Sequence, residues 1–189
     1  MTRFVGPIQQ IGVIVQDAEA EARHWAECIG AGPFVFFRKI AFDADYQYRG
    51  QATEPPVVTI AVGHSGATQI EIIQQHNEAP SAYREYLDSG RQGMQHVSTW
   101  CGTPRQYDEY RARMLSEGHA IVHEGRVAGT EVRFAYFETA SKGWPLLEIS
   151  EALLPVIRPL SQLLEAMNST WDGQQPFLDF EDIAGRLQG

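Results

Sequence analysis

The stretch QIGVIVQD, residues 10–17, decides the fold because its order of elements returns once more along the chain. Its apolar residues alternate with small or polar ones, which is the period of a β-strand. Asp17 is a typical helix-capping residue, and Ala18 to Ile29 carries apolar residues at helical spacing before Gly30. We therefore predict a strand followed directly by a helix at the start of a longer unit.

Three more strands are predicted after this helix, over residues 34–40, 57–62 and 68–73. The polar and aromatic segment 43–54, between the first two, is predicted to be a solvated hairpin loop. The alternative is that its acidic and aromatic residues, Asp43, Asp45, Tyr46 and Tyr48, close over the mouth of a binding site. Together these elements make a βαβββ module over residues 8–75.

The same order returns in a second module, residues 94–150. HVSTWC, residues 96–101, predicts a strand, and Thr103 with Pro104 begins a helix that Gly118 ends. Strands are predicted at 120–123, 131–137 and 145–150, with a turn at 141–144 before the last. Gln10 and His96 are 86 residues apart, as are the two helix starts at 18 and 104. An internal repeat of this kind outweighs local propensity as evidence for a fold.

These patterns predict an α+β fold of two tandem βαβββ modules within one domain, residues 1–150. A helix over 79–89 links the modules. A C-terminal extension, residues 151–189, is predicted to be helical over 153–167. Its tail carries a tryptophan and two phenylalanines, which favours packing against the core over a free tail.

The composition excludes several classes of protein. The net charge is −9 and no basic run occurs, which argues against nucleic acid and anionic membrane surfaces. No run of 18 apolar residues predicts a membrane span, and the first residues lack the features of a signal peptide. Cys28 and Cys101 are expected to be reduced, so we expect a cytoplasmic protein.

Arginine outnumbers lysine thirteen to two. The base composition of the source genome is sufficient to explain such a ratio. The alternative is that Arg38, Arg49 or Arg133 binds a carboxylate or phosphate of a ligand.

One polar residue with ligand atoms interrupts each of four apolar strands. Strand alternation places Gln10, Glu71, His96 and Glu148 opposite the apolar face of their strands. A carboxylate among Ile and Leu side chains is unfavourable unless it is paired or binds a metal. The alternative is that each glutamate faces water at a sheet edge. An amide oxygen, an imidazole and two carboxylates suit one divalent ion with open positions for water.

Four segments resemble the vicinal oxygen chelate (glyoxalase/bleomycin resistance/dioxygenase) superfamily: QIGVIVQD (10–17), QIEII (69–73), GMQHVS (93–98) and LLEI (146–149). The resemblance covers residues 8–150 and is nearest to the glyoxalase I and methylmalonyl-CoA epimerase types. It implies that the modules form a cupped, incomplete barrel around a metal held by Gln10, Glu71, His96 and Glu148. The sequence after Glu71 and beyond residue 150 departs from both types, so the resemblance implies no substrate.

The resemblance implies a lyase or an isomerase/epimerase that acts on a small carbonyl-containing substrate. A Zn, Ni, Co, Mn or Fe ion would polarise the carbonyl and stabilise the enediolate formed on deprotonation. We expect Glu148 to be the base, with Glu71 able to act from the opposite side. The alternatives are an extradiol dioxygenase, which needs two histidines and one glutamate, and a metal-free small-molecule binding protein. Two modules close the cup without a partner, although such proteins often form homodimers.

Other residues carry weaker expectations. The register of His123 points it into the cup, and Gly12 is predicted to admit a substrate or backbone at close range. Trp100, Phe134 and Tyr136 are expected to pack in the core, with the alternative that they form apolar walls of the cup if they face inward.

Overall fold

The first module follows the predicted order. The computed structural model describes residues 5–139 and 145–187, so the turn expected at 141–144 lies outside the described residues. The module consists of β1 (Gln10–Ile14), α1 (Ala18–His24) with a π-helical turn (Trp25–Ile29), β2 (Phe34–Ala41), β5 (Val57–Ser65) and β6 (Thr68–Gln75). The Asp17 side chain accepts hydrogen bonds from the backbone N–H groups of Glu19 and Ala20, which fixes the start of α1.

The second module repeats the first. It consists of β7 (Gly93–Trp100), α3 (Pro104–Ser116), β8 (Ile121–Arg126), β9 (Arg133–Phe137) and β10 (Leu146–Ser150). The linking helix α2 (Ala82–Asp88) is shorter than predicted because Ser81 caps it, accepting a hydrogen bond from the backbone N–H of Arg84.

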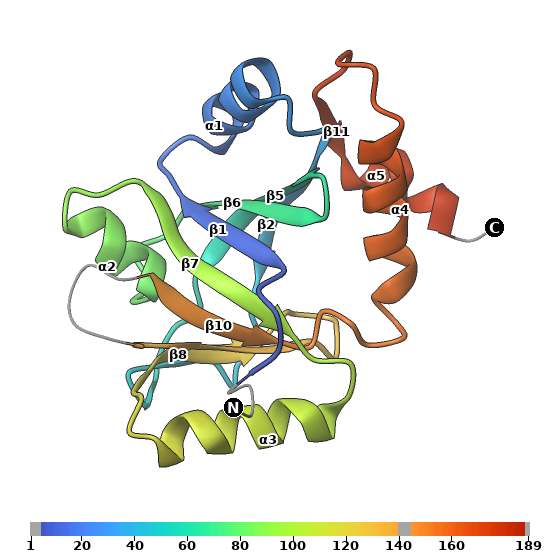
Figure 1. Ribbon diagram of the computed structural model, residues 1–189. Helices are drawn as coiled ribbons and strands as arrows, with labels where there is room; N and C mark the ends of the chain where they lie inside the picture. The colour runs from blue at the N-terminus through green and yellow to red at the C-terminus, as the bar shows by residue number, and fades with distance from the viewer. Residues whose placement is uncertain (1–4, 140–144, 188–189) are drawn as a thin grey trace.

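The two modules meet along β1 and β7. These strands pair antiparallel, while β6 runs parallel to β1 and β10 runs parallel to β7. The described strands form one 11-stranded sheet, in which the central order β2-β5-β6-β1-β7-β10-β9-β8 is symmetric about the β1–β7 junction. The predicted α+β fold of paired modules is therefore confirmed, with a curved sheet that does not close (Figure 1).

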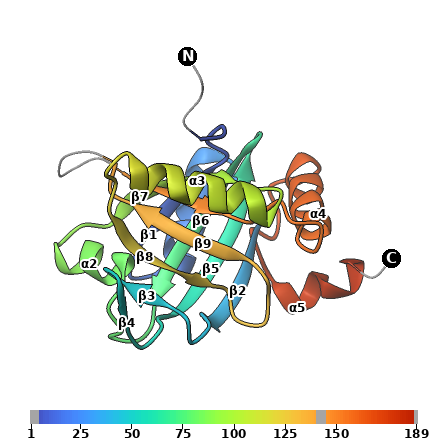
Figure 2. The same ribbon diagram turned by 90° about the horizontal axis from the view of Figure 1, so that it is seen from below.

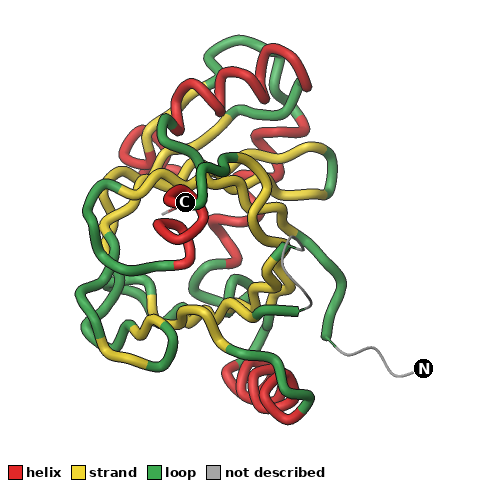
Figure 3. Tube along the Cα trace, turned by 90° about the vertical axis from the view of Figure 1, so that its left-hand side faces the viewer, coloured by secondary structure: helices red, strands yellow, loops and turns green. Residues whose placement is uncertain are grey.

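The helices α1 and α3 cover the outside of the curved sheet at opposite ends (Figures 1 and 3). Under α1 lie Val13, Val15 and Ile72, and under α3 lie Ala135 and Ile149. The opposite faces of the same strands form an inner core that includes Ile14, Ile73, Phe134 and Tyr136. Strand alternation therefore sends the polar residues of these strands to the inside of the curve.

The segment predicted to be a solvated hairpin loop forms a largely exposed hairpin that also joins the sheet. It forms the short strands β3 (Gln47–Tyr48) and β4 (Gln51–Ala52), and β3 pairs with β8 of the second module (Figure 2). Tyr46 is fully buried, and its hydroxyl donates to the carbonyl of Pro80. The sequence did not predict the burial of Tyr46 or the pairing with β8, because the remaining residues of the segment are mostly polar and exposed.

The C-terminal segment packs against the first module. It contains α4 (Arg158–Ser169), β11 (Phe177–Asp179), α5 (Phe180–Ile183) and a 3₁₀ turn (Ala184–Leu187). The helix α4 begins five residues later than the predicted residue 153, with Pro159 in its first turn, where a proline is tolerated. β11 pairs in parallel with β2 and so extends the sheet. Among the described residues, no helix combines the length and apolar character needed to cross a membrane.

Candidate metal centre

Three of the four predicted ligands lie together on the inside of the curved sheet. Glu71 of β6, His96 of β7 and Glu148 of β10 each offer one ligand atom, and these atoms lie within 4.8 Å of one another. The His96 Nε2 atom is 3.4 Å from a Glu71 carboxylate oxygen and 3.8 Å from a Glu148 carboxylate oxygen. Both modules therefore contribute to one cluster.

Gln10 occupies the place in the first module that His96 occupies in the second. Gln10 lies two residues before Gly12, the strand partner of Glu71, just as His96 lies two residues before the strand partner of Glu148. The Gln10 side chain is buried, donates a 2.7 Å hydrogen bond to Gln69 and is hydrogen-bonded to Glu71. Gln10 thus contacts the cluster through its amide N–H groups, and its role as a ligand through Oε1 stays a prediction.

A neighbouring glutamine sets the orientation of His96. Gln95 donates a 3.0 Å hydrogen bond from Nε2 to the carbonyl of Ala82, so its Oε1 faces His96 Nδ1 at 2.8 Å and accepts that proton. The lone pair of Nε2 is then directed at the two carboxylates. Metal-binding histidines are commonly held in this way by an acceptor at the second ring nitrogen. Burial lowers the pKa of His96 to about 4, which keeps the ring neutral and able to bind a cation.

Gly12 makes room for the His96 ring. A Cβ atom at residue 12 would lie 1.8 Å from the nearest ring carbon of His96. The sequence predicted a close approach at Gly12 but assigned it to substrate or backbone. The approaching group is instead the imidazole of the opposite strand.

Burial makes both glutamates costly to ionise. It raises the pKa of Glu71 to about 7, partly offset by the hydrogen bond from Gln10. Burial also raises the pKa of Glu148 to about 7, and repulsion from Glu71 adds to this effect. A divalent cation between the two carboxylates would offset both effects by stabilising the ionised forms. One neutral imidazole and two buried carboxylates therefore fit an ion such as Zn, Ni, Co, Mn or Fe.

Two tyrosine hydroxyls extend the site beyond the predicted residues. Tyr136 of β9 lies 3.3 Å from His96 Nε2, and Tyr83 of α2 donates a 3.2 Å hydrogen bond to the Tyr136 hydroxyl. Burial raises the pKa of both tyrosines well above the ordinary value, so both remain neutral donors. Tyr136 was expected in the core, with an apolar wall of the cup as the alternative, and it lines the cavity. Tyr83 was missed because the sequence does not show where the linking helix packs.

His123 does not reach the cavity. It is fully buried, its Nδ1 lies 3.0 Å from the Tyr46 hydroxyl, and its ring packs against Tyr136 with centroids 4.3 Å apart. The expectation that its register points it into the cup is thus corrected: His123 lies in the aromatic core behind Tyr136.

A cavity of about 500 Å³ opens onto the cluster. Gln10, Glu71 and Glu148 line it together with Tyr83 and Tyr136, so the cluster has space beside it for a small molecule.

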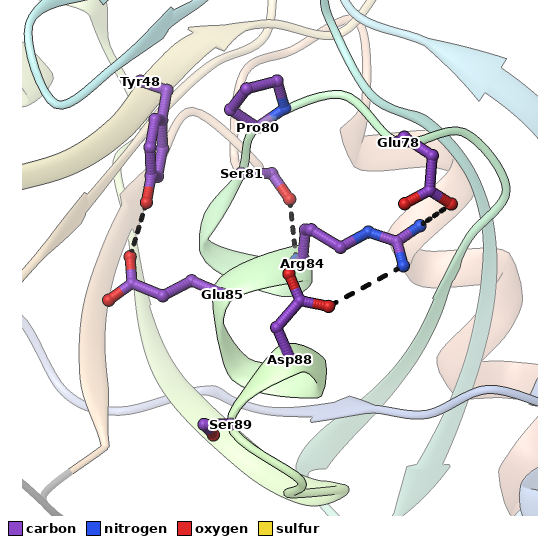
Figure 4. A pocket seen from close by; sticks show the side chains of 8 residues that line it. All are labelled: Tyr48, Glu78, Pro80, Ser81, Arg84, Glu85, Asp88 and Ser89. Carbon is purple, nitrogen blue, oxygen red and sulfur yellow. Dashed lines mark hydrogen bonds and ion pairs between the residues drawn. The ribbon is translucent and has the colours of Figure 1, made fainter.

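A second hollow of about 520 Å³ lies on the surface of α2 and shares no lining residue with this cavity (Figure 4). Its charged groups bind one another: Arg84 is paired with Glu78 and Asp88, and Tyr48 donates to Glu85. We therefore assign the site to the first cavity.

The arginines considered as ligand-binding groups are engaged within the protein. Arg38 pairs with Glu19 and Asp179, Arg49 with Glu85 and Glu138, and Arg133 with Asp108 and Glu151. None of the three lines the cavity. Cys28 is exposed, Cys101 is buried, and the two are not paired.

Comparisons with known proteins give one family and one fold. A model of the glyoxalase/bleomycin resistance protein/dioxygenase superfamily matches residues 9–137, which confirms the resemblance seen in the sequence. Methylmalonyl-CoA epimerase from Mycobacterium tuberculosis is 19% identical, with 80% of this chain and 91% of that chain covered at a TM-score of 0.54.

Two further solved structures are similar. A variant of the Streptomyces coelicolor methylmalonyl-CoA epimerase, in complex with 2-nitronate-propionyl-CoA, is 16% identical and covers 78% of this chain and 97% of that chain (TM-score 0.52). A hypothetical protein from Bacillus halodurans is 16% identical, and the match covers 77% of this chain and 93% of that chain (TM-score 0.50). No curated protein sequence matches this chain. At identities this low, the comparisons with these structures show a shared fold and nothing more.

Proposed function

Because this chain belongs to the glyoxalase/bleomycin resistance protein/dioxygenase superfamily, we propose that it is a metal-dependent enzyme that moves a proton beside a carbonyl group. The reaction is an isomerisation or epimerisation, or a lyase reaction with the same first step, on a small molecule. The observation that carries the proposal is the cluster of Glu71, His96 and Glu148, in which His96 and Glu148 are buried, Glu71 is partly buried and both carboxylates line a cavity.

Glu71, His96 and Glu148 would hold the metal, with Gln10 as a fourth ligand once its amide turns Oε1 inward. A bound ion polarises a substrate carbonyl and acidifies the adjacent C–H group. Gln95 holds the His96 ring in place, and the Tyr136 hydroxyl, which accepts a hydrogen bond from Tyr83, offers a neutral hydrogen-bond donor. All these residues belong to one chain, so the site needs no second copy, and the expected homodimer is a separate question for light scattering.

We assign the base to Glu148. Without metal, burial raises the pKa of Glu148 to about 7, so this carboxylate, once released from a bound ion by substrate, would have a pKa near the working pH, where a base works best. Glu71 belongs to the other module and approaches from the opposite strand pair. Two carboxyl groups on opposite sides of one carbon allow one to remove the proton and the other to return it.

The two alternative functions, an extradiol dioxygenase and a metal-free binding protein, would require different residues at the site. An extradiol dioxygenase holds iron with two histidines and one carboxylate, whereas this cluster has one histidine and two carboxylates. A metal-free binding protein would use the cavity alone, and elemental analysis of the purified protein separates it from the proposed enzyme.

The test is the variant Glu148→Gln, which keeps a ligand oxygen but accepts no proton. We expect metal content near that of the wild type and a loss of solvent deuterium incorporation into α-hydroxyketones of roughly 10²–10⁴-fold. Glu109→Gln, on the exposed surface of α3, is the matched control and should exchange at the wild-type rate. Full exchange in metal-replete Glu148→Gln would move the base to Glu71, and absence of metal in the wild type would overturn the proposed function.

A further inference from the structure

The C-terminal segment forms one wall of the cavity at the candidate metal centre. One side of the cavity is lined by residues of the first module, such as Phe37 and Ile60, and another by residues of the second, such as Val132. The remaining wall comes from α4 and α5, through Leu160 and Phe180 among others. Figure 1 shows α4 and α5 at the side of the curved sheet.

This wall is fixed to the first module. Leu164 packs in a buried cluster with Val35, Val62 and Ile183. Phe180 stacks on Phe37 with ring centroids 5.0 Å apart. These contacts join α4 and α5 to β2 and β5, so the segment is a built part of the cavity.

The Asn168 side chain ties the end of α4 to the same module by donating hydrogen bonds to the carbonyls of Gly32 and His64. At the far side of the segment, Asp179 pairs with Arg38 of β2.

The cavity has a polar end and an apolar body. Gln10, Gln69, Glu71 and Glu148 mark the polar end at the metal centre. The segment 152–187 contributes apolar side chains to the lining, apart from Ser161. Within residues 5–139 and 145–187, no arginine, lysine or histidine lines the cavity. A buried anion without a cationic partner is strongly unfavourable, so the body of this cavity selects against negative charge.

We propose that the C-terminal segment makes the cavity a chamber for an uncharged carbonyl compound with a largely hydrocarbon body. The carbonyl end lies at Glu71 and Glu148, and the hydrocarbon body lies under α4 and α5. A cavity of about 500 Å³ is within the range that encloses drug-sized ligands. Only the position of the carbonyl end rests on the proposed function; the preference for an apolar, neutral body rests on the walls.

The test is calorimetric titration of the metal-loaded protein with 1-hydroxy-2-alkanones of increasing chain length. We expect each added methylene to tighten the Kd by up to about fourfold until the chamber is full. The same ketones with a carboxylate at the far end of the chain should bind at least about tenfold more weakly. A Kd that does not change with chain length, or equal binding of the carboxylated series, overturns the proposal.

A charge introduced into the wall should reverse the preference. Leu160→Arg should weaken the neutral series and strengthen the carboxylated series. Gln162→Arg adds the same charge on the exposed side of α4 and should leave both series unchanged. Loss of neutral ligand binding in both variants would place the effect outside the cavity and count against the proposal. If Leu160→Arg does not fold, the titrations of the wild type with the neutral and the carboxylated ketones decide whether the cavity prefers an uncharged ligand.

Titration after chelator treatment separates this inference from the proposed function. The dependence on chain length should persist without metal, because the walls cause it, while every Kd becomes weaker. Chain-length dependence in a protein that binds no metal would overturn the proposed function alone. Metal-dependent proton exchange without chain-length dependence would overturn only the proposed preference for an uncharged compound with a hydrocarbon body.

Discussion

Gly12 and His96 form a pair in which the missing side chain of one residue makes room for the ligand atoms of the other. In Gly12→Ala the new methyl group would overlap the imidazole, so the ring must leave its place against Gln95. We expect a loss of unfolding free energy of about 1–3 kcal/mol and a metal affinity at least about tenfold weaker.

The matched control for Gly12→Ala is Gly102→Ala. A Cβ atom at residue 102 meets its nearest neighbours at 3.9 Å, an ordinary contact distance. Thermal unfolding and metal competition titrations measure both variants. A Gly12→Ala protein that binds metal as tightly as Gly102→Ala would show that His96 is not the ligand held by this contact.

Glu71 and Glu148 give the metal-free protein a defined pH dependence. Their pKa values are raised from 4.5 to about 7 by burial, so between these pH values the folded state binds more protons than the unfolded state. Their contribution to the unfolding free energy therefore decreases as the pH rises from about 4.5 to about 7. His96 contributes the opposite slope from about pH 4 to 6.5, because burial lowers its pKa.

The measured quantity is thus the unfolding free energy of the wild type minus that of Glu71→Gln/Glu148→Gln, with chelator present. We expect this difference to fall across the window from pH 4.5 to 7 and to be constant above it. Saturating zinc should stabilise the wild type increasingly across the same window, because bound carboxylates must be ionised. A difference that is flat with pH would mean that the two carboxyl groups ionise as in water.

At the level of elements, the side chain of Asn168 fastens α4 to the loop before β2 and to the end of β5. Asn168→Ala leaves the carbonyls of Gly32 and His64 without this donor, and we expect a loss of about 1–3 kcal/mol in unfolding free energy. Hydrogen exchange of α4 should accelerate and neutral ligands should bind more weakly, while the metal affinity stays at the wild-type value. Ser169→Ala, at an exposed neighbouring position, is the control. Unchanged exchange in α4 would contradict the role of Asn168 as its anchor.

Strand alternation and the repeat were enough to predict the elements that carry the cluster. Glu71, His96 and Glu148 interrupt apolar strands, and the fold turns all three inward. Other features depend on how distant elements pack. The polar composition of segment 43–54 hid its pairing with β8, and Tyr83 reaches the site only because α2 packs against the inner face. The use of α4 as a cavity wall depends likewise on tertiary packing, which a single sequence does not contain.

On the scale of the whole molecule, the symmetry between the modules explains why only one of the two first strands carries a histidine. The junction of β1 and β7 pairs Gly12 with His96 and Gln10 with Ser98. An imidazole at residue 96 lies over a glycine. An imidazole at residue 10 would face the side chain of Ser98 instead, so the symmetric place for a second histidine is obstructed.

This asymmetry predicts the outcome of a paired substitution. Gln10→His alone should reduce the metal affinity roughly 10- to 100-fold, because the new ring is held out of position. Gln10→His/Ser98→Gly supplies the missing space and should bind zinc at least as tightly as the wild type, with two imidazoles and two carboxylates as ligands. Ser98→Gly alone measures the separate effect of the glycine, which should lower the unfolding free energy by roughly 0.5–1 kcal/mol. Competition titration with a zinc chelator gives the affinities. Equal affinity in Gln10→His and the double variant would show that the space over residue 98 does not limit the ligand at residue 10, and the symmetry argument would fail.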